Sequence, residues 1–229
     1  MDNEIPLALG GMLVGSSVPS SIGSSLGRSL ADEMGDLSLN DKNRLKSILR
    51  KEFNPGEVRV VMSGEPNFQG DYDSIPSHLR DTHKIKPGQK VVNLTEGRTS
   101  LPVALHELGH AQEPKSSLSR LLRNSNVRGY GGLLSSLGFI PASYVGRRFA
   151  EGSDISPWAI AGTVLGALGS TPVLAEELRA TRNANRLAKK HNIGKLRGLR
   201  RAFGTYLAGA AVPVMAGLGA GTALGIGGK

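Results

Sequence analysis

The sequence predicts a mainly α-helical protein with a small β element, in which Gly- and Ala-rich helices cross a membrane. Three observations predict this class. Four long windows contain no charged residue, so every Lys, Arg, Asp and Glu lies between or beyond them. Two short segments are rich in valine, which is typical of strands. The charged segments carry apolar residues at helical spacing, which indicates amphipathic helices.

Each charge-free window is about long enough to span a bilayer as a helix, which takes roughly 20 residues. The windows are Ile5–Gly27, Gly129–Gly146, Ile155–Ala175 and Ala202–Gly228. Glycines four residues apart occur in several windows, and such spacing lets helix backbones approach closely inside a membrane. We therefore expect these helices to contact a lipid bilayer and to pack closely, a mode of packing that also suits a homo-oligomer.

The basic residues predict an orientation. If all four windows span, 25 of the 28 Lys and Arg residues fall on one side of the membrane. Positive charge favours the cytoplasmic side, so we expect a membrane location with the charged segments in the cytoplasm. The two middle windows then form a hairpin with a short outer loop. The first residues are acidic, with Asp2 and Glu4, and do not resemble a cleavable signal peptide.

The segments between the windows contain further predicted elements. A helix over Leu39–Phe53 has Asn40 or Asp41 as its cap, and the polar stretch Ser63–Gln89 is expected to be a loop. The remaining expected elements are strands over Glu57–Met62 and Lys90–Leu94, a helix from Thr99 or Ser100 to about Glu113, and a helix from Val173 to about Lys190.

Composition excludes several kinds of site. The chain has no cysteine, which excludes disulfides, Cys-ligated zinc, iron–sulfur clusters and a thiol nucleophile. Its formal charge of +9 favours an anionic partner. Aromatic residues make up only 4%, which disfavours base-stacking nucleic-acid modules. The basic run Arg179–Arg201 is better explained by an anionic membrane surface than by nucleic acid.

The most specific motif is the run Val103–Ala111, which contains His106, Glu107 and His110. Two histidines four apart share one helix face, so that both imidazoles can bind one zinc ion. Glu107 follows the first histidine and is placed to act as general base toward a water at the metal. Gly109 is expected to leave room beside the ion. A string of this kind is rare by chance, and its apolar, proline-free helical setting favours the zinc interpretation.

A catalytic zinc ion keeps three protein ligands, so a third must come from elsewhere in the chain. Glu176 and Glu177 follow the third window, and either carboxylate would serve. We prefer Glu177, because Thr181 stands one turn later as a polar supporting residue, whereas Glu176 is followed by Ala180. The alternative is that both acids are solvated and offset the nearby arginines. An oxyanion stabiliser is also needed, and the sequence does not choose between three candidates, Tyr130, His83 and Arg182.

These motifs resemble the small membrane-associated neutral zinc metallopeptidases of the gluzincin kind. That family has a short strand, a His-Glu-x-Gly-His-Ala helix, a hydrophobic hairpin, a Glu-x-x-Ala-Ser/Thr helix and a final hydrophobic segment. Here the matching parts are Val91–Leu94, His106–Ala111, the two middle windows, Glu177–Thr181 and Ala202–Gly228. The chain departs from the family at Gln112, where a hydrophobic residue is usual, and in its glycine-rich last segment. The resemblance implies a zincin-like catalytic helix and covers about residues 90–228.

The expected organisation therefore has five parts. They are a Gly/Ser-rich hydrophobic segment over 1–27, a soluble zincin-like catalytic part over 28–128, a hydrophobic hairpin over 129–175, a basic helix with the third zinc ligand over 176–201, and a Gly-rich hydrophobic segment over 202–229.

The expected function is a membrane-associated, zinc-dependent endopeptidase that acts on peptide or protein substrates. Zn²⁺ would be held by His106, His110 and Glu177, with Glu107 as general base. The alternative is a membrane-inserting component of a virion or secretion apparatus, assembled in many copies, in which the zinc hydrolase site is ancillary.

Overall fold

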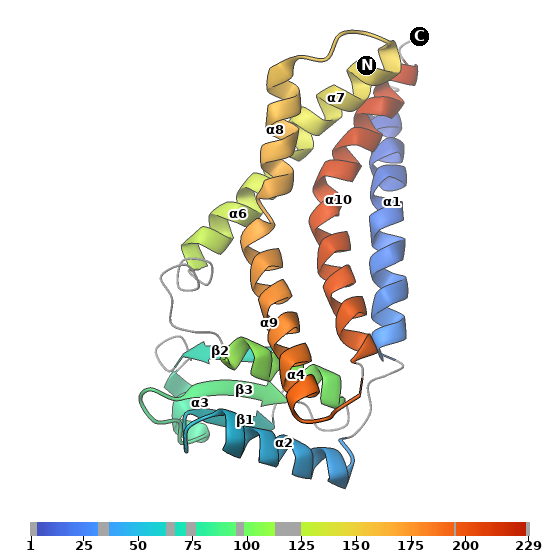
Figure 1. The fold of residues 1–229 in the computed structure, drawn as a ribbon. Helices are drawn as coiled ribbons and strands as arrows, with labels where there is room; N and C mark the ends of the chain where they lie inside the picture. Colours follow the sequence, from blue (N-terminus) through green and yellow to red (C-terminus); the bar gives the residue numbers. More distant parts are fainter. Residues whose placement is uncertain are drawn as a thin grey trace. The chain divides into compact units, whose positions relative to one another are not determined.

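The computed structural model describes residues 4–31, 37–62, 67–71, 77–94, 99–112, 125–194 and 196–227. It confirms a mostly helical protein with one small sheet (Figure 1). The chain folds into two compact units. The helical unit comprises Met1–Gly27, Ser117–Ala175 and Gly204–Lys229, and the sheet unit comprises Arg28–Ser116 and Glu176–Phe203.

The sheet unit contains three strands, β1 (Val58–Met62), β2 (Asn67–Asp71) and β3 (Lys90–Leu94). Their order is β1-β3-β2, with β1 parallel and β2 antiparallel to the central β3. The helices of this unit are α2 (Leu39–Glu52), α3 (Ser77–Thr82), α4 (Leu101–Ala111) and the part of α9 (Thr171–Lys190) that follows Ala175. The predicted helices at α2 and α4 and the predicted strands at β1 and β3 are confirmed. Glu113, the expected end of the α4 helix, lies outside the described residues.

Two predictions for this unit are wrong. The cap of α2 is Ser38, whose Oγ accepts a hydrogen bond from the Asp41 amide at 3.1 Å. Asn40 and Asp41 are instead inside the first turn, where the acidic side chain of Asp41 interacts favourably with the positive end of the helix dipole. The predicted loop Ser63–Gln89 contains β2 and α3. The strand β2 has no alternating apolar pattern and was therefore not predicted. Its pairing with β3, in which the register shifts between Phe68 and Gly70, holds it in the sheet.

One core joins the sheet to the helices of the same unit. Val92 and Leu94 of β3 pack with buried side chains of α2, α4 and α9. Val91 points to the opposite face of the sheet, where it packs with Val61 and Ile85. This core fixes α4 against the sheet, and α4 carries the histidine motif.

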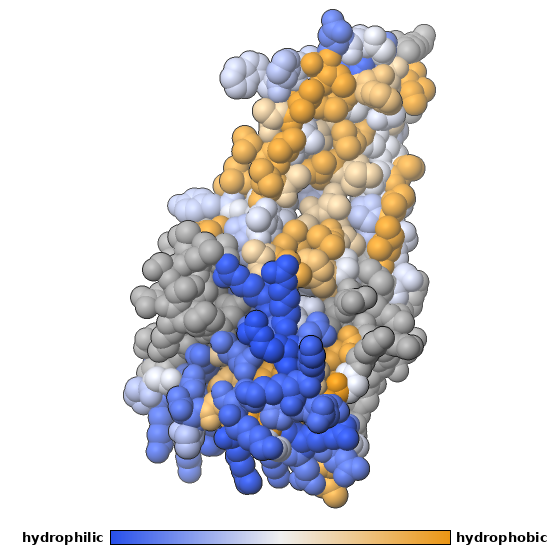
Figure 2. Space-filling view, viewed as in Figure 1, coloured by the Kyte–Doolittle hydropathy of each residue, from blue (hydrophilic) through white to orange (hydrophobic). Residues whose placement is uncertain are grey.

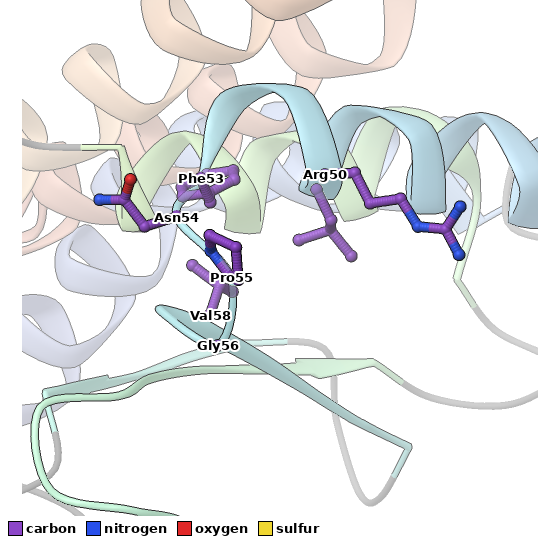
Figure 3. Close-up of a pocket in the computed structure, with 7 residues that line it drawn as sticks. Arg50, Phe53, Asn54, Pro55, Gly56 and Val58 are labelled. Atoms are coloured by element: carbon purple, nitrogen blue, oxygen red, sulfur yellow. The ribbon is translucent and has the colours of Figure 1, made fainter.

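The turn between α2 and β1 borders a shallow hollow on the sheet unit (Figure 3). Leu49, Phe53, Pro55 and Val58 give the hollow an apolar lining. The polar side chains on its rim, Arg50 and Asn54, extend away on opposite sides (Figure 3).

The helical unit is built from α1 (Glu4–Ala31), α6 (Ser125–Leu137), α7 (Phe139–Glu151), α8 (Pro157–Leu168), the start of α9 and α10 (Arg197–Gly227). The window Gly129–Gly146 is therefore not one helix, because the chain turns at Gly138 between α6 and α7. The expected start of α9 at Val173 is two residues late, since Pro172 is accommodated in the first turn.

Glycines allow these helices to approach one another closely. A Cβ at Gly138 would lie 2.6 Å from the Cα atom of Gly166, so α8 packs directly on the turn between α6 and α7. Gly217, Gly221 and Gly225 of α10 face the backbone of α7 in the same way. The four-residue spacing noted in the sequence thus serves close packing within the chain.

Two helical stretches are long and apolar enough to cross a membrane, Pro157–Lys190 and Phe203–Gly227. The apolar part of the first ends at Ala175, because charged residues follow from Glu176 onward. A third apolar segment, Ala8–Ile22, is shorter. Within the described residues, two of the four expected spans therefore meet the length and hydropathy of a spanning helix.

Large exposed hydrophobic side chains are confined almost entirely to the helical unit. They include Trp158, which is 86% exposed, and Phe149, which is 75% exposed; in the described part of the sheet unit, Leu39 is the single case. Figure 2 shows hydrophobic side chains gathered over the helical unit and hydrophilic ones over the sheet unit. Such extended apolar patches are uncommon on soluble proteins and mark surfaces that contact lipid or a partner.

Candidate metal centre

His106 and His110 lie one turn apart on α4, and both side chains are buried. Their ring centroids are 4.9 Å apart and the rings are nearly perpendicular, at 88°. The arrangement follows from the sequence, because residues i and i+4 of an α-helix share one face. Ser100 stands at the N-cap of α4 and Pro102 lies in its first turn. Ser100 makes no side-chain capping hydrogen bond, but proline is well suited to the first turn, so the helix begins shortly before the motif.

Glu177 of α9 completes a buried group with the two histidines. Its Oε2 atom lies 3.0 Å from His106 Nε2 and 3.5 Å from His110 Nε2. One ligand atom from each of the three residues lies within 4.8 Å of the others. Two imidazole nitrogens and a carboxylate oxygen at this spacing could hold a metal ion.

The electrostatics of the group agree with this use. Burial disfavours the charged form of Glu177, but its contacts with His106 and His110 outweigh burial and lower the pKa of the carboxyl to about 2. Burial likewise opposes protonation of His110, yet Glu177, Glu107 and Glu176 together raise the pKa of its imidazole. The site therefore attracts positive charge, which can be a proton or a metal ion.

Polar side chains of α9 also reach the second nitrogen of each imidazole. Thr181 Oγ1 lies 3.4 Å from His106 Nδ1, and Glu176 Oε1 lies 3.8 Å from His110 Nδ1. Both rings therefore present Nε2 to Glu177 and Nδ1 to supporting groups. Of these two contacts, the one from Thr181 is within hydrogen-bond distance, and the one from Glu176 is an ion-pair distance. Polar groups placed at the second nitrogen help to orient metal-ligating histidines. Glu176 and Thr181 both belong to this surround, but the Thr181 hydroxyl contacts His106 rather than Glu177, the partner expected from the sequence.

Glu107 is buried beside the ligand group, with 8% of its surface exposed. It follows His106 on α4 and its charge acts on the imidazole of His110. A buried carboxylate next to the ligand residues is the kind of group that serves as a general base.

The structure shows why the motif helix can lie so close to α9. A Cβ on Gly109 would fall 3.1 Å from the Ala184 amide nitrogen and closer still to the Ala180 carbonyl oxygen. Gly109 thus makes room for the backbone of α9, whereas the sequence suggested that it makes room beside the ion. Asn183 Nδ2 donates to the Gly109 carbonyl oxygen at 3.0 Å and links the two helices directly.

Sequence reasoning missed Asn183 and Lys90. Lys90 is buried, and its Nζ donates to the carbonyl oxygen of Ala111, the last residue of α4, at 2.6 Å. A cation at this place interacts favourably with the negative end of the α4 helix dipole. Asn183 carries a weak signal, because it lies three residues after Ala180 on the same side of α9. A lysine at the first residue of a strand gives none.

The three oxyanion candidates come from different parts of the chain. Tyr130 is on α6 in the helical unit and is 68% exposed. His83 follows α3, and Arg182 is exposed on α9 on the side opposite Glu177. Within the described residues, no hydrogen bond or ion pair joins any of the three to the ligand group.

Comparisons with known proteins add no relative: no family model, no curated protein and no solved structure matches this chain. The functional proposal therefore rests on the geometry of the site and on the motif that supplies it.

Proposed function

We propose that the protein is a membrane-associated, zinc-dependent endopeptidase. The observation that carries this proposal is the buried group of His106, His110 and Glu177, with Glu107 beside it on the motif helix. A ligand group without an adjacent acid would suit a structural metal equally well. A buried carboxylate next to the ligands adds the general base that hydrolysis requires.

The donor set favours zinc among the common metals. Two imidazole nitrogens and one carboxylate oxygen are the typical ligands of a catalytic zinc site, which leaves a fourth position open. Magnesium and calcium prefer sites made of oxygen ligands alone. A zinc ion held by these residues supplies Lewis acidity toward a carbonyl and toward water.

The protein's own residues account for the remaining steps. His106 and His110 would bind the ion through Nε2, the atoms that face Glu177, while Thr181 and Glu176 lie nearest their Nδ1 atoms. Glu107 accepts a proton from the attacking water at its carboxylate and then gives it to the leaving amine. Burial of all four side chains limits competing solvent and strengthens each electrostatic interaction.

Membrane association rests on a separate set of observations. Two helical stretches meet the criteria for spanning, and the exposed hydrophobic side chains gather on the unit that contains them. The distribution of basic residues favours the cytoplasmic side for the sheet unit and its metal centre.

The experiment that tests the enzymatic part uses full-length protein purified in detergent, with a fluorogenic random-peptide library as the substrate. Wild-type protein should cleave the library and lose activity on treatment with a chelator. Glu107→Gln should retain zinc and lose at least about a hundredfold in rate, since general bases contribute 10²–10⁴-fold. His191→Ala, which removes a histidine that pairs with Glu52 rather than with the ligand group, is the matched control and should cleave the library at the wild-type rate. Full activity of Glu107→Gln would contradict the proposed mechanism.

A further inference from the structure

A second site is suggested by a cavity of about 480 Å³ in the helical unit, bordered by α6, the junction of α8 and α9, and α10. Four side chains with hydrogen-bond donors line it: Arg128, Ser170, Thr205 and Tyr206. The remaining lining is glycine, alanine, valine and leucine, and none of the described lining residues is acidic. The volume is within the usual range for small-molecule sites, about 300–1,000 Å³.

Residues at the boundaries of three charge-free windows line the cavity. Arg128 is the last charged residue before Gly129–Gly146, and Leu174 lies next to the end of Ile155–Ala175. Thr205 and Tyr206 lie near the start of Ala202–Gly228. These segments are far apart in the sequence, yet all three reach the cavity where charged sequence gives way to apolar sequence. In a membrane this level corresponds to the lipid headgroups.

The chemistry of the lining suits a phosphate group. An arginine offers five N–H donors in a planar fork that matches phosphate oxygens, and hydroxyl groups add further donors. The lining also has an apolar part at Val173 and Leu174, and exposed Leu133 and Leu207 are adjacent in sequence to lining residues. A ligand with a phosphate at one end and hydrocarbon at the other would satisfy both parts.

We propose that this cavity binds the phosphate of an anionic phospholipid from the cytoplasmic leaflet. Basic pockets between membrane helices on that side are known to take anionic headgroups. Tyr206 is 42% exposed, so the mouth of the cavity is open to a lipid that approaches from the bilayer. The proposal relies on the membrane location proposed above and is independent of the metal centre.

The test is native mass spectrometry of the full chain in detergent, titrated with dioleoylphosphatidylglycerol. Wild-type protein should retain one lipid per chain, with dioleoylphosphatidylcholine bound at least about tenfold more weakly because its choline offsets the phosphate charge. Arg128→Gln should weaken phosphatidylglycerol binding by at least about tenfold, and Tyr206→Phe by a few-fold. Arg147→Gln is the matched control, because Arg147 is an arginine of the same unit that does not line the cavity. It should bind as wild type.

Three results would overturn the proposal. One is equal binding by Arg128→Gln and Arg147→Gln, and another is equal affinity for the two lipids. The third is displacement of the lipid by inorganic phosphate added at the same concentration as the lipid. That result would assign the site to a soluble phosphate compound. Should Arg128→Gln fail to fold, Arg128→Lys and Tyr206→Phe test the same donors. Zinc content measured on the same samples separates this outcome from that of the metal centre.

Discussion

Replacing Gly109 by alanine should weaken metal binding while leaving the sheet unit folded. The added Cβ would lie 3.1 Å from the Ala184 amide nitrogen and closer to the Ala180 carbonyl oxygen, whereas ordinary contact begins at 3.4 Å. Both are backbone atoms of α9, so no side-chain rotation can relieve the overlap. Helices α4 and α9 would have to separate by roughly 1 Å to restore van der Waals distances.

A separation of that size matters more for the ligands than for the fold. Glu177 Oε2 and His106 Nε2, now 3.0 Å apart, would move out of position together with their helices. Metal sites tolerate deviations of only about 0.2 Å in ligand distance, so we expect zinc affinity to fall by at least about tenfold. Overpacking costs about 1–3 kcal/mol, and the better helix propensity of alanine returns about 1 kcal/mol.

The assay is competition for zinc with a chromophoric chelator, combined with thermal unfolding of the metal-free protein. Gly129→Ala is the matched control, because Gly129 is also helical but has no atom within 4 Å of an added Cβ. It should keep wild-type zinc affinity. Wild-type affinity in Gly109→Ala would refute the claim that close contact between α4 and α9 positions the ligands.

Three further predictions concern the same helices. Asn183→Ala should lower the free energy of unfolding by about 1 kcal/mol, because the Asn183 side chain links α9 to α4. Asn185→Ala should have a smaller effect, because the hydrogen bond of Asn185 stays within α9. Equal effects of the two substitutions in denaturant titrations would contradict this. Glu177→Gln should abolish zinc binding, whereas Glu176→Gln should weaken it about 10–100-fold; the reverse order in equilibrium dialysis would make Glu176 the ligand. The rise in Tm on adding zinc should grow between pH 5.5 and 8. The raised pKa of His110 means that its proton stabilises the metal-free fold below about pH 6.5 and is lost as pH rises through the folded pKa. A zinc-induced rise that is constant or falls with pH in thermal scans would show that zinc does not replace this proton.

Local patterns predicted the motif side of the site, and tertiary packing decided the rest. His106 and His110 share a face of α4 by helix geometry alone, which any capped helix over the motif would give. Glu177 is 71 residues from His106, and the sequence suggested it only through its place before a polar residue one turn later. The partner of Thr181 was missed because it depends on where α4 lies, which the sequence of α9 does not contain.

The departures in the fold have a similar origin. The strand β2 carries no apolar alternation and exists through its pairing with β3. The turn at Gly138 interrupts an uncharged window in which several glycines could equally mark a break. Close packing on Gly166 favours the break at Gly138. Ser38 was overlooked as a cap because its two polar neighbours in the first turn offered equally good side chains.

The most direct test of the central claim is the metal content of the purified full-length protein, measured by inductively coupled plasma mass spectrometry. The proposed centre predicts about one zinc ion per chain in the wild type and in His83→Ala, and none in His106→Ala. A wild-type protein without zinc, or a His106→Ala variant that keeps it, would contradict the account.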